Sequence, residues 1–294
     1  DRSDGFLVLL RYAQDQAMVQ AGLQLLRELG VPFHEVPAHV ARAVEPALNP
    51  ETALQGAVHV PGDEVGNCRQ FALQLKDEAQ RLGCRFHFGT EVARLDAQPL
   101  RLWTRARAGD TPEAQTGFGA VVLCAGVDSA ALARPLGLRI PLTAVHGHSI
   151  SVAVREDMDA PVSAVMDERY KVAISRLGQR VRVAGGAEIG GRVDRAGAKA
   201  FDTLHKVLHD WFPGAARHGR TGGQMQVWKG ARPMLPDGPP LVGATALPGL
   251  WLNLGHGSSG WALSNGSARV LADGLGGREP AIDTGALSPQ RLKG

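Results

Sequence analysis

The chain has 294 residues, of which 44% are hydrophobic and 21% are charged, and its formal net charge is +3. This composition is typical of a folded globular protein, and the mild charge, with no basic run interleaved with aromatic residues, argues against nucleic-acid binding. Cys68, Cys84 and Cys124 stand far apart without metal-ligand or redox spacing. We therefore expect no metal site and no disulfide framework, and a reducing, cytoplasmic compartment. No apolar stretch approaches the ~20 residues that span a bilayer.

Hydrophobic periodicity and turn residues predict mixed helices and strands up to residue 139. The expected elements are a strand over Gly5–Leu10, a helix over Tyr12–Leu29, an extended piece over Phe33–Val36, a helix over Pro37–Glu45, a strand over Gly56–Val60, a helix capped by Asn67 and ending at Leu82, strands over Arg85–Phe88 and Glu91–Leu95, a hairpin of Leu100–Arg107 with Gly117–Cys124, and a helix from Asp128 to Leu136. The inner faces of the two long helices should be Ala17, Ala21, Leu25, Leu26 and Leu29 in the first, and Phe71, Leu75, Ala79 and Leu82 in the second. The apolar run Ala120–Gly126 is typical of a strand buried on both faces.

From Ile140 onward, alternating strands separated by turn residues predict an antiparallel sheet. The expected elements are strands over His148–Val154, Val162–Met166, Tyr170–Ser175 and Arg180–Ala184, a helix over Ala196–Trp211, a strand over Gln224–Lys229, a rigid turn in Pro233–Gly243, and a strand, turn and helix over Trp251–Leu275. The α/β and antiparallel patterns interleave along the chain. This predicts an α/β (α+β) fold of two domains built from discontinuous segments, with a ligand cleft at their junction.

A glycine-rich turn, Gly255–Gly260, joins the last strand to the last helix. Such a turn points bare backbone N–H groups and the positive helix end at whatever lies above it. It therefore either stabilises negative charge on a ring or carboxylate, or serves only as a tight connection. The turn itself has the spacing G-x-G-x-x-G, and no other segment of the chain has it. Because no strand is expected after the helix that it opens, the turn does not begin the βαβ unit that usually binds a dinucleotide pyrophosphate.

Three other positions are candidates for chemistry. Arg232 lies between a strand and Pro233, where its planar fork suits a bidentate grip on a carboxylate, although a structural ion pair is the more common role. Tyr170 is expected to start a strand, where its hydroxyl either donates to a carboxylate or simply faces water. Ala125 and Gly126 end the buried strand, at the edge where α/β sheets bind ligands or where a plain turn begins.

Taken together, several ordered segments resemble the FAD-dependent D-amino-acid dehydrogenase (small subunit) family, within the wider group of D-amino-acid oxidase, glycine oxidase and sarcosine oxidase. The segments cover nearly the whole chain and are GVPFHEV, VEPAL, VPGDEVGNCRQFALQL, DAPVSAVMDERYKVAISR, RVAGGAEI, KGARPMLPDGPPLVG and WLNLGHGSSGW. The family pattern also contains an N-terminal βαβ unit with a glycine-rich finger, which has no counterpart here. The resemblance thus implies a chain that begins after that unit.

The resemblance implies two interleaved domains, a partial FAD-binding Rossmann-like domain over 61–139 and 236–294 and an antiparallel-sheet substrate domain over 1–60 and 140–235. It implies that Arg232 binds the substrate carboxylate, with Tyr170 as a second donor. The implied cofactor-binding residues are Val92 at the adenine end, Ala125 and Gly126 beside the cofactor, and Gly255, His256, Gly257, Ser258, Ser259 and Gly260 at the flavin.

The activity implied by the resemblance is oxidative deamination of D-amino acids to 2-oxo acids and ammonia, with a hydride passing from the α-carbon to FAD. By family analogy, electrons pass on to a quinone or another carrier, which allows peripheral association with the inner face of the membrane. Two alternatives stay open. The same fold oxidises glycine, sarcosine or another secondary or cyclic amine, or the chain is a non-catalytic subunit that completes its site with a second polypeptide.

Overall fold

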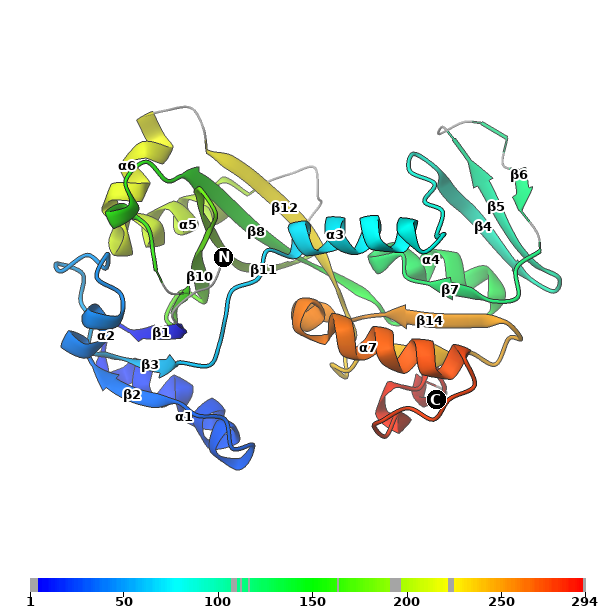
Figure 1. Ribbon diagram of the computed structural model, residues 1–294, viewed down its shortest axis with the longest axis horizontal. Helices are drawn as coiled ribbons and strands as arrows, with labels where there is room; N and C mark the ends of the chain where they lie inside the picture. Colours follow the sequence, from blue (N-terminus) through cyan, green and yellow to red (C-terminus); the bar gives the residue numbers. More distant parts are fainter. Residues whose placement is uncertain are drawn as a thin grey trace. The chain divides into compact units, whose positions relative to one another are not determined.

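The computed structural model describes residues 5–292 except 107–109, 112, 116, 163, 191–196 and 222–224. The chain divides into two compact units, each assembled from two separate stretches of sequence (Figure 1). The first unit combines Asp1–Leu73 with His146–Gly230, and the second combines Gln74–Val145 with Ala231–Gly294. The fold is the predicted α/β arrangement of interleaved parts. The predicted domain ranges stay a prediction, because they were defined by the cofactor and the substrate that each part would hold.

The first unit is built around a mostly antiparallel sheet, in which β1 and β9 pair in parallel, with helices packed on it. Its elements are β1 (Phe6–Leu10), α1 (Ala13–Glu28), β2 (His34–Pro37), α2 (Ala38–Val44), β3 (Gly56–Val60), β9 (Ala164–Asp167), β10 (Val172–Leu177), β11 (Arg180–Ile189), α5 (Ala198–Trp211) and α6 (Pro213–Thr221). Three elements continue across the division between the units: α3 (Cys68–Arg81), β8 (Thr143–Ala153) and β12 (Gln226–Met234). The strand order in the sheet is β12-β8-β11-β10-β9-β1-β3-β2.

Strand β1 shows why the first unit carries helices on two faces of its sheet. Alternate residues of a strand point to opposite faces. Leu7 and Leu9 are fully buried in the cluster that also contains Trp211 of α5, whereas Phe6 and Val8 pack in a separate cluster with Leu23 of α1. The unit therefore has two apolar layers, one under α5 and one under α1.

Most strands and helices of the first unit lie close to their predicted positions, but β8 begins five residues before its predicted start, β11 and β12 each end five residues beyond their predicted ends, and α6 was not predicted. The predicted inner faces of α1 and α3 are largely wrong, although Leu26 of α1 does face inward as predicted. In α1 the inward residues are Val19, Leu23 and Leu26. Ala17, Ala21, Leu25 and Leu29 are exposed, since the larger apolar side chains at i, i+4 and i+7 meet β3 instead. No residue of α3 is buried among those described, and Leu75 and Leu82 are exposed. The cap of α3 is as predicted, because the Gln70 N–H donates to Asn67 Oδ1 at 3.2 Å. The predicted element ends at Arg107, Ala196 and Gln224 lie outside the described residues.

The second unit holds two small sheets and a long helix. Its elements are β4 (Glu91–Ala97), β5 (Leu100–Arg105), β6 (Glu113–Gln115), β7 (Val121–Leu123), α4 (Ser129–Ala133), β13 (Leu241–Ala244), β14 (Leu250–Leu254) and α7 (Gly260–Leu275). One sheet has the order β13-β14-β7 and the other β4-β5-β6. None of the helices within the described ranges combines the length and apolarity needed to cross a membrane.

Two strand predictions in the second unit are wrong. Gly117–Cys124 does not form a hairpin with the segment that starts at Leu100. Strand β5 pairs with β4 and β6, while β7 pairs in parallel with β14. The apolar β7 joins the sheet where Leu123 packs against Leu252 and Leu254, which buries more apolar surface than an exposed hairpin would. Arg85–Phe88 is not a strand, because it pairs with no neighbour in the described part of the chain, and Phe86 and Phe88 stack on each other while exposed.

Candidate functional site

The candidate site lies at one edge of the sheet of β7 and β14 in the second unit. Because the two strands are parallel, with Leu252 opposite Leu123, their carboxyl ends reach the same edge. Ala125 and Gly126 follow β7, and Gly255–Gly260 follows β14. Ligands in open α/β sheets bind beyond the carboxyl ends of the strands. The structure thus brings together two of the predicted cofactor-binding segments that are far apart in sequence.

The backbone of the glycine turn leaves the start of α7 accessible. Gly255 and Gly257 have φ values of +80° and +56°, a region that glycine enters without a steric penalty. Ser259, the residue before α7, makes no side-chain hydrogen bond to the first turn, and Ser258 and Ser259 are exposed. This 16-residue helix therefore begins without a side-chain cap from Ser259, and its positive N-terminal end favours a negative or carbonyl group.

Packing beneath the turn also favours glycine at positions 255 and 257. A Cβ on Gly257 would lie 2.7 Å from Met234 Sδ, and a Cβ on Gly255 would lie 2.5 Å from Leu235 Cδ1. Met234 also forms an antiparallel bridge with His256. Close packing against the end of β12 therefore explains why glycine occupies these two positions. A ligand at this edge would instead meet the N-terminal end of α7.

Replacing Gly257 with alanine should destabilise the second unit by ~1–3 kcal/mol, because the new methyl group collides with Met234 at a backbone conformation that L-residues avoid. The matched control is Gly266→Ala, which lies on the exposed side of α7 with no atom within 4 Å of a new Cβ. That control should be neutral or stabilising by up to ~1 kcal/mol. Urea unfolding of both variants measures the difference, and equal midpoints would contradict this account of the turn.

His256 is held in the turn by a hydrogen-bonding contact with the helix that follows. Its Nε2 lies 3.1 Å from Ser267 Oγ, on α7. Burial lowers the pKa of His256 below the ordinary histidine value. The positive end of α7 adds to this, since a second positive charge there is unfavourable. His256 is therefore a neutral ring at pH 7.

Arg232 and Val92, two further predicted site residues, also belong to the second unit. Arg232 does not follow the strand as predicted but lies within β12, which continues to Met234. It is half-buried there, two residues before Met234, whose backbone pairs with His256. Strand β12 thus brings Arg232 to within about two strand positions, ~7 Å, of the turn. Val92 lies on β4 opposite Thr104 and packs against the apolar core that β7 and β14 share.

Tyr170 does not start a strand as predicted. It lies in the turn between β9 and β10, because Asp167 Oδ1 accepts the Tyr170 backbone N–H at 3.1 Å and closes that turn. Two cations of the first unit make cation–π contacts with its ring. Arg11 Cζ lies 5.1 Å and Lys206 Nζ lies 5.2 Å from the ring centroid. This packing accounts for the position of Tyr170, and its role as a substrate donor stays a prediction.

The carboxylate of Asp167, three residues before Tyr170, was not predicted to be important. Asp167 is fully buried and accepts hydrogen bonds from Arg11 Nε at 2.8 Å and from Trp211 Nε1 at 2.7 Å. Arg11 Nη2 also lies 2.9 Å from Asp210. The available signal was an aspartate directly after the apolar residues Ala164, Val165 and Met166, a place where a carboxylate needs a partner.

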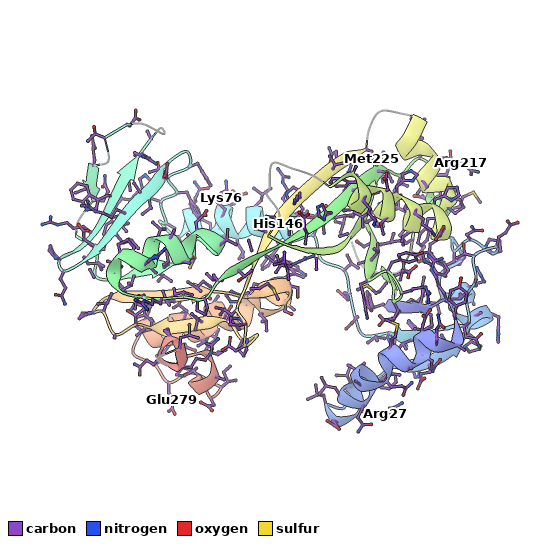
Figure 2. All side chains as sticks on the ribbon, turned by 180° about the vertical axis from the view of Figure 1, so that it is seen from behind. Arg27, Lys76, His146, Arg217, Met225 and Glu279 are labelled. Atoms are coloured by element: carbon purple, nitrogen blue, oxygen red, sulfur yellow. The ribbon has the colours of Figure 1, made fainter. Side chains whose placement is uncertain are left out.

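A second polar cluster of the first unit, formed by Lys229, Glu188 and His148, was also not predicted. Lys229 Nζ lies 3.0 Å and His148 Nε2 lies 3.4 Å from Glu188 Oε2, and buried His146 lies two residues before His148 on β8 (Figure 2). The hydrogen bond and the positive charge of Lys229 lower the pKa of Glu188. No group of three or more His, Cys, Asp or Glu side chains among the described residues is arranged to hold a metal ion.

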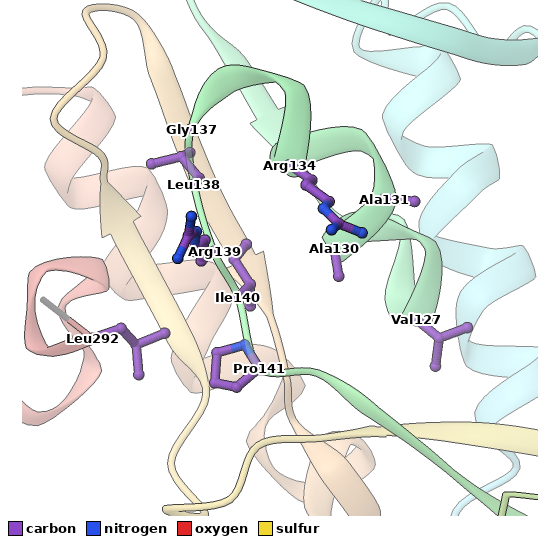
Figure 3. Close-up of a pocket in the computed structure, with 10 residues that line it drawn as sticks. All are labelled: Val127, Ala130, Ala131, Arg134, Gly137, Leu138, Arg139, Ile140, Pro141 and Leu292. Carbon is purple, nitrogen blue, oxygen red and sulfur yellow. The ribbon is translucent and has the colours of Figure 1, made fainter. Parts of the chain in front are cut away.

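The second unit also contains a hollow (Figure 3). It has a volume of about 1100 Å³ and is lined by Val127, Ala130, Ala131, Arg134, Gly137, Leu138, Arg139, Ile140, Pro141 and Leu292. Its lining is mainly apolar with two guanidinium groups, Arg134 and Arg139. None of the predicted site residues lines it, so it adds nothing to the candidate site.

Comparison with known proteins gives consistent matches over the whole chain. The family described as "FAD dependent oxidoreductase" matches residues 2–274. A D-amino acid dehydrogenase of Cereibacter sphaeroides is 40% identical over 292 residues, which are 99% of this chain and 65% of that protein. One of Bradyrhizobium diazoefficiens is also 40% identical over 292 residues, 99% of this chain and 68% of its own length. The chain thus spans about two thirds of these relatives.

The fold is similar to that of a solved structure with a lower sequence identity. Glycine oxidase from Geobacillus kaustophilus superposes with a TM-score of 0.84 at 23% identity, covering 99% of this chain and 76% of that one. At this identity the likeness supports the fold alone.

Proposed function

The chain belongs to the family of FAD-dependent oxidoreductases, and we propose that it takes part in the oxidative deamination of D-amino acids to 2-oxo acids and ammonia. The observation that carries this proposal is the sheet edge where Ala125 and Gly126 meet the turn Gly255–Gly260. It occurs in a chain that is 40% identical to D-amino acid dehydrogenases over 99% of its length.

The residues at this edge fit the flavin part of FAD. A flavin ring presents carbonyl oxygens and ring nitrogens, and the positive N-terminal end of α7, which has no side-chain cap from Ser259, is complementary to them. An added Cβ on Gly126 meets no atom within 4 Å, so a flat group has room to approach that backbone. The exposed hydroxyls of Ser258 and Ser259 add donors that can rotate toward such a group.

The chemistry divides between the cofactor and the chain. FAD, when bound, supplies the acceptor for the hydride of the substrate α-carbon. Arg232 would bind the substrate carboxylate through its planar fork and so fix the position of the α-carbon. The N-terminus of α7 would stabilise negative charge that develops during the reaction. Neutral His256 would avoid adding a positive charge of its own at the turn.

The remaining parts of the proposal concern partners. We propose Val92 as a contact at the adenine end and Tyr170 as a second donor to the substrate, as the sequence resemblance implies. Electrons would pass to a quinone or another carrier, with peripheral attachment to a membrane. The identity to D-amino acid dehydrogenases favours D-amino acids over glycine, sarcosine and other secondary amines.

The test is a visible absorption spectrum of the purified chain before and after addition of FAD. We expect bound flavin whose oxidised band bleaches anaerobically with a D-amino acid, and much less with sarcosine or the L-enantiomer. Bleaching by sarcosine alone would support the secondary-amine alternative. Absence of bound flavin at any FAD concentration would contradict the proposal for this chain and favour a subunit that needs a second polypeptide.

A further inference from the structure

The Ser267 hydroxyl contacts His256 and two carbonyl groups of its own helix at the same time. Ser267 lies on α7 and is 8% exposed. Its Oγ is 2.8 Å from the Leu263 carbonyl oxygen, 3.2 Å from the Ser264 carbonyl oxygen, and 3.1 Å from His256 Nε2. One hydroxyl group therefore lies between two helix carbonyl groups and one imidazole nitrogen.

Counting protons assigns the direction of each bond. A serine hydroxyl has one hydrogen to donate and two lone pairs that accept. Carbonyl oxygens accept only, and a serine inside a helix commonly donates to the carbonyl four residues earlier. The shortest of the three contacts is that one, to Leu263, so the Ser267 hydrogen goes to the helix. The remaining contact is satisfied only if His256 Nε2 carries a hydrogen and donates to Ser267 Oγ.

The charge on the ring follows from its surroundings. Half-burial and the positive end of α7 both disfavour an imidazolium at this place. A neutral imidazole carries one N–H, and the bond to Ser267 puts it on Nε2. The other nitrogen, Nδ1, is then a bare lone pair.

We propose that Ser267 is a positioning residue that holds His256 as the neutral tautomer protonated at Nε2, so that Nδ1 is left as a hydrogen-bond acceptor at the glycine turn. The tautomer stands on the geometry of the chain alone. The use of Nδ1 toward a ligand rests on the proposed function. An oxidised flavin ring has one ring N–H, at N3, and this donor is complementary to an acceptor such as Nδ1. A protonated or Nδ1–H ring would instead offer a donor or a charge.

The tautomer is tested by long-range ¹H–¹⁵N NMR of the ¹⁵N-histidine-labelled chain at pH 7.5 without flavin. The chain has 10 histidines, and the signals that disappear in His256→Asn belong to His256. We expect the pattern of a ring protonated at Nε2, and a mixture of tautomers in Ser267→Ala. Ser267→Thr keeps the hydroxyl and should restore the wild-type pattern.

The matched control is Ser264→Ala. Ser264 lies on the same helix and its Oγ donates to the Trp261 carbonyl at 2.8 Å, a bond of the same type without a histidine partner. It should leave the His256 signals unchanged. An Nδ1–H tautomer in the wild type, or a Ser267→Ala spectrum identical to wild type in a folded protein, would overturn the proposal.

A second readout addresses the ligand. Removal of one hydrogen bond predicts that Ser267→Ala weakens FAD binding ~2- to 12-fold, while Ser264→Ala and Ser267→Thr bind as the wild type does. Wild-type FAD affinity in Ser267→Ala, together with a changed tautomer, would refute the use of Nδ1 toward the flavin. If no variant and no wild type binds FAD, the proposed function fails, and the NMR result alone decides the tautomer.

Discussion

Replacing Asp167 with alanine should destabilise the first unit by ~3–5 kcal/mol, the cost of removing one partner from a buried ion pair. Arg11 and Asp167 are 8% and 0% exposed, and Arg11 Nη2 lies 2.6 Å from Asp167 Oδ2. Without the carboxylate, the Arg11 guanidinium keeps Asp210 as its carboxylate partner among the described residues, and Trp211 Nε1 loses its acceptor inside the core. Because α5 and the strands β1 and β9 meet at these atoms, the loss should reach all three elements. Urea unfolding followed by far-ultraviolet circular dichroism measures the effect.

An exposed aspartate–arginine pair in the same unit is the matched control. Arg176 Nη2 lies 2.6 Å from Asp157 Oδ1, the same separation as in the buried pair, but Asp157 is 86% exposed. Asp157→Ala should therefore cost less than ~1 kcal/mol. Equal effects of the two substitutions would show that burial does not determine the value of these pairs. A double-mutant cycle with Arg11→Ala separates the coupling between the two side chains from the loss of each alone.

The sequence predicted most of the secondary structure because local signals decide it. Glycines and prolines punctuate the chain, and β1, β3, α2 and α7 lie within one or two residues of their predicted bounds. The errors come from long-range pairing. Val121–Leu123 looked like half of a local hairpin, but its partner β14 is more than 100 residues away in sequence. The periodicity of one segment does not show which other strand that segment will pair with.

The candidate site shows the same division between local and long-range information. The glycine turn and Arg232 were found from residue type and position next to a strand. The proximity of the turn and Arg232 was not predicted, because the bridge between Met234 and His256 joins the end of β12 to the turn after β14, two segments with no shared sequence pattern. The pair of His256 with Ser267 could have been suspected from its spacing only after α7 was known to start at Gly260.

Tyr170 illustrates how a reading based on one residue type goes wrong. The sequence pattern draws attention to the phenol, but the buried carboxylate of Asp167, three residues earlier, has the larger effect on stability. In the structure the carboxylate organises the turn, and the ring of Tyr170 stacks on the cation that the carboxylate holds. Charge and burial together were the informative signals, and burial was not available from the sequence.

Replacing Arg232 with lysine should lower kcat/KM for a D-amino acid by ~10- to 150-fold, and Arg232→Gln should lower it further. Lysine keeps the positive charge but presents a point charge in place of a planar fork, so one of two charged hydrogen bonds to the carboxylate is lost. Such a bond contributes ~1.5–3 kcal/mol, and each 1.36 kcal/mol corresponds to about tenfold in rate. Glutamine also removes the charge. Steady-state kinetics of the FAD-loaded protein measures the effect, and binding of the 2-oxo acid product gives a readout that needs no turnover.

Arg134→Lys is the control for a general effect of removing a guanidinium from the second unit. Arg134 is exposed, lies outside the candidate site and lines the separate hollow beside α4. Its substitution should leave kcat/KM and product binding unchanged. If Arg232→Lys also leaves both unchanged, Arg232 does not bind the carboxylate, and another residue must do so. A fall in kcat/KM with unchanged product binding would instead indicate that Arg232 acts on the reacting group and not on the carboxylate.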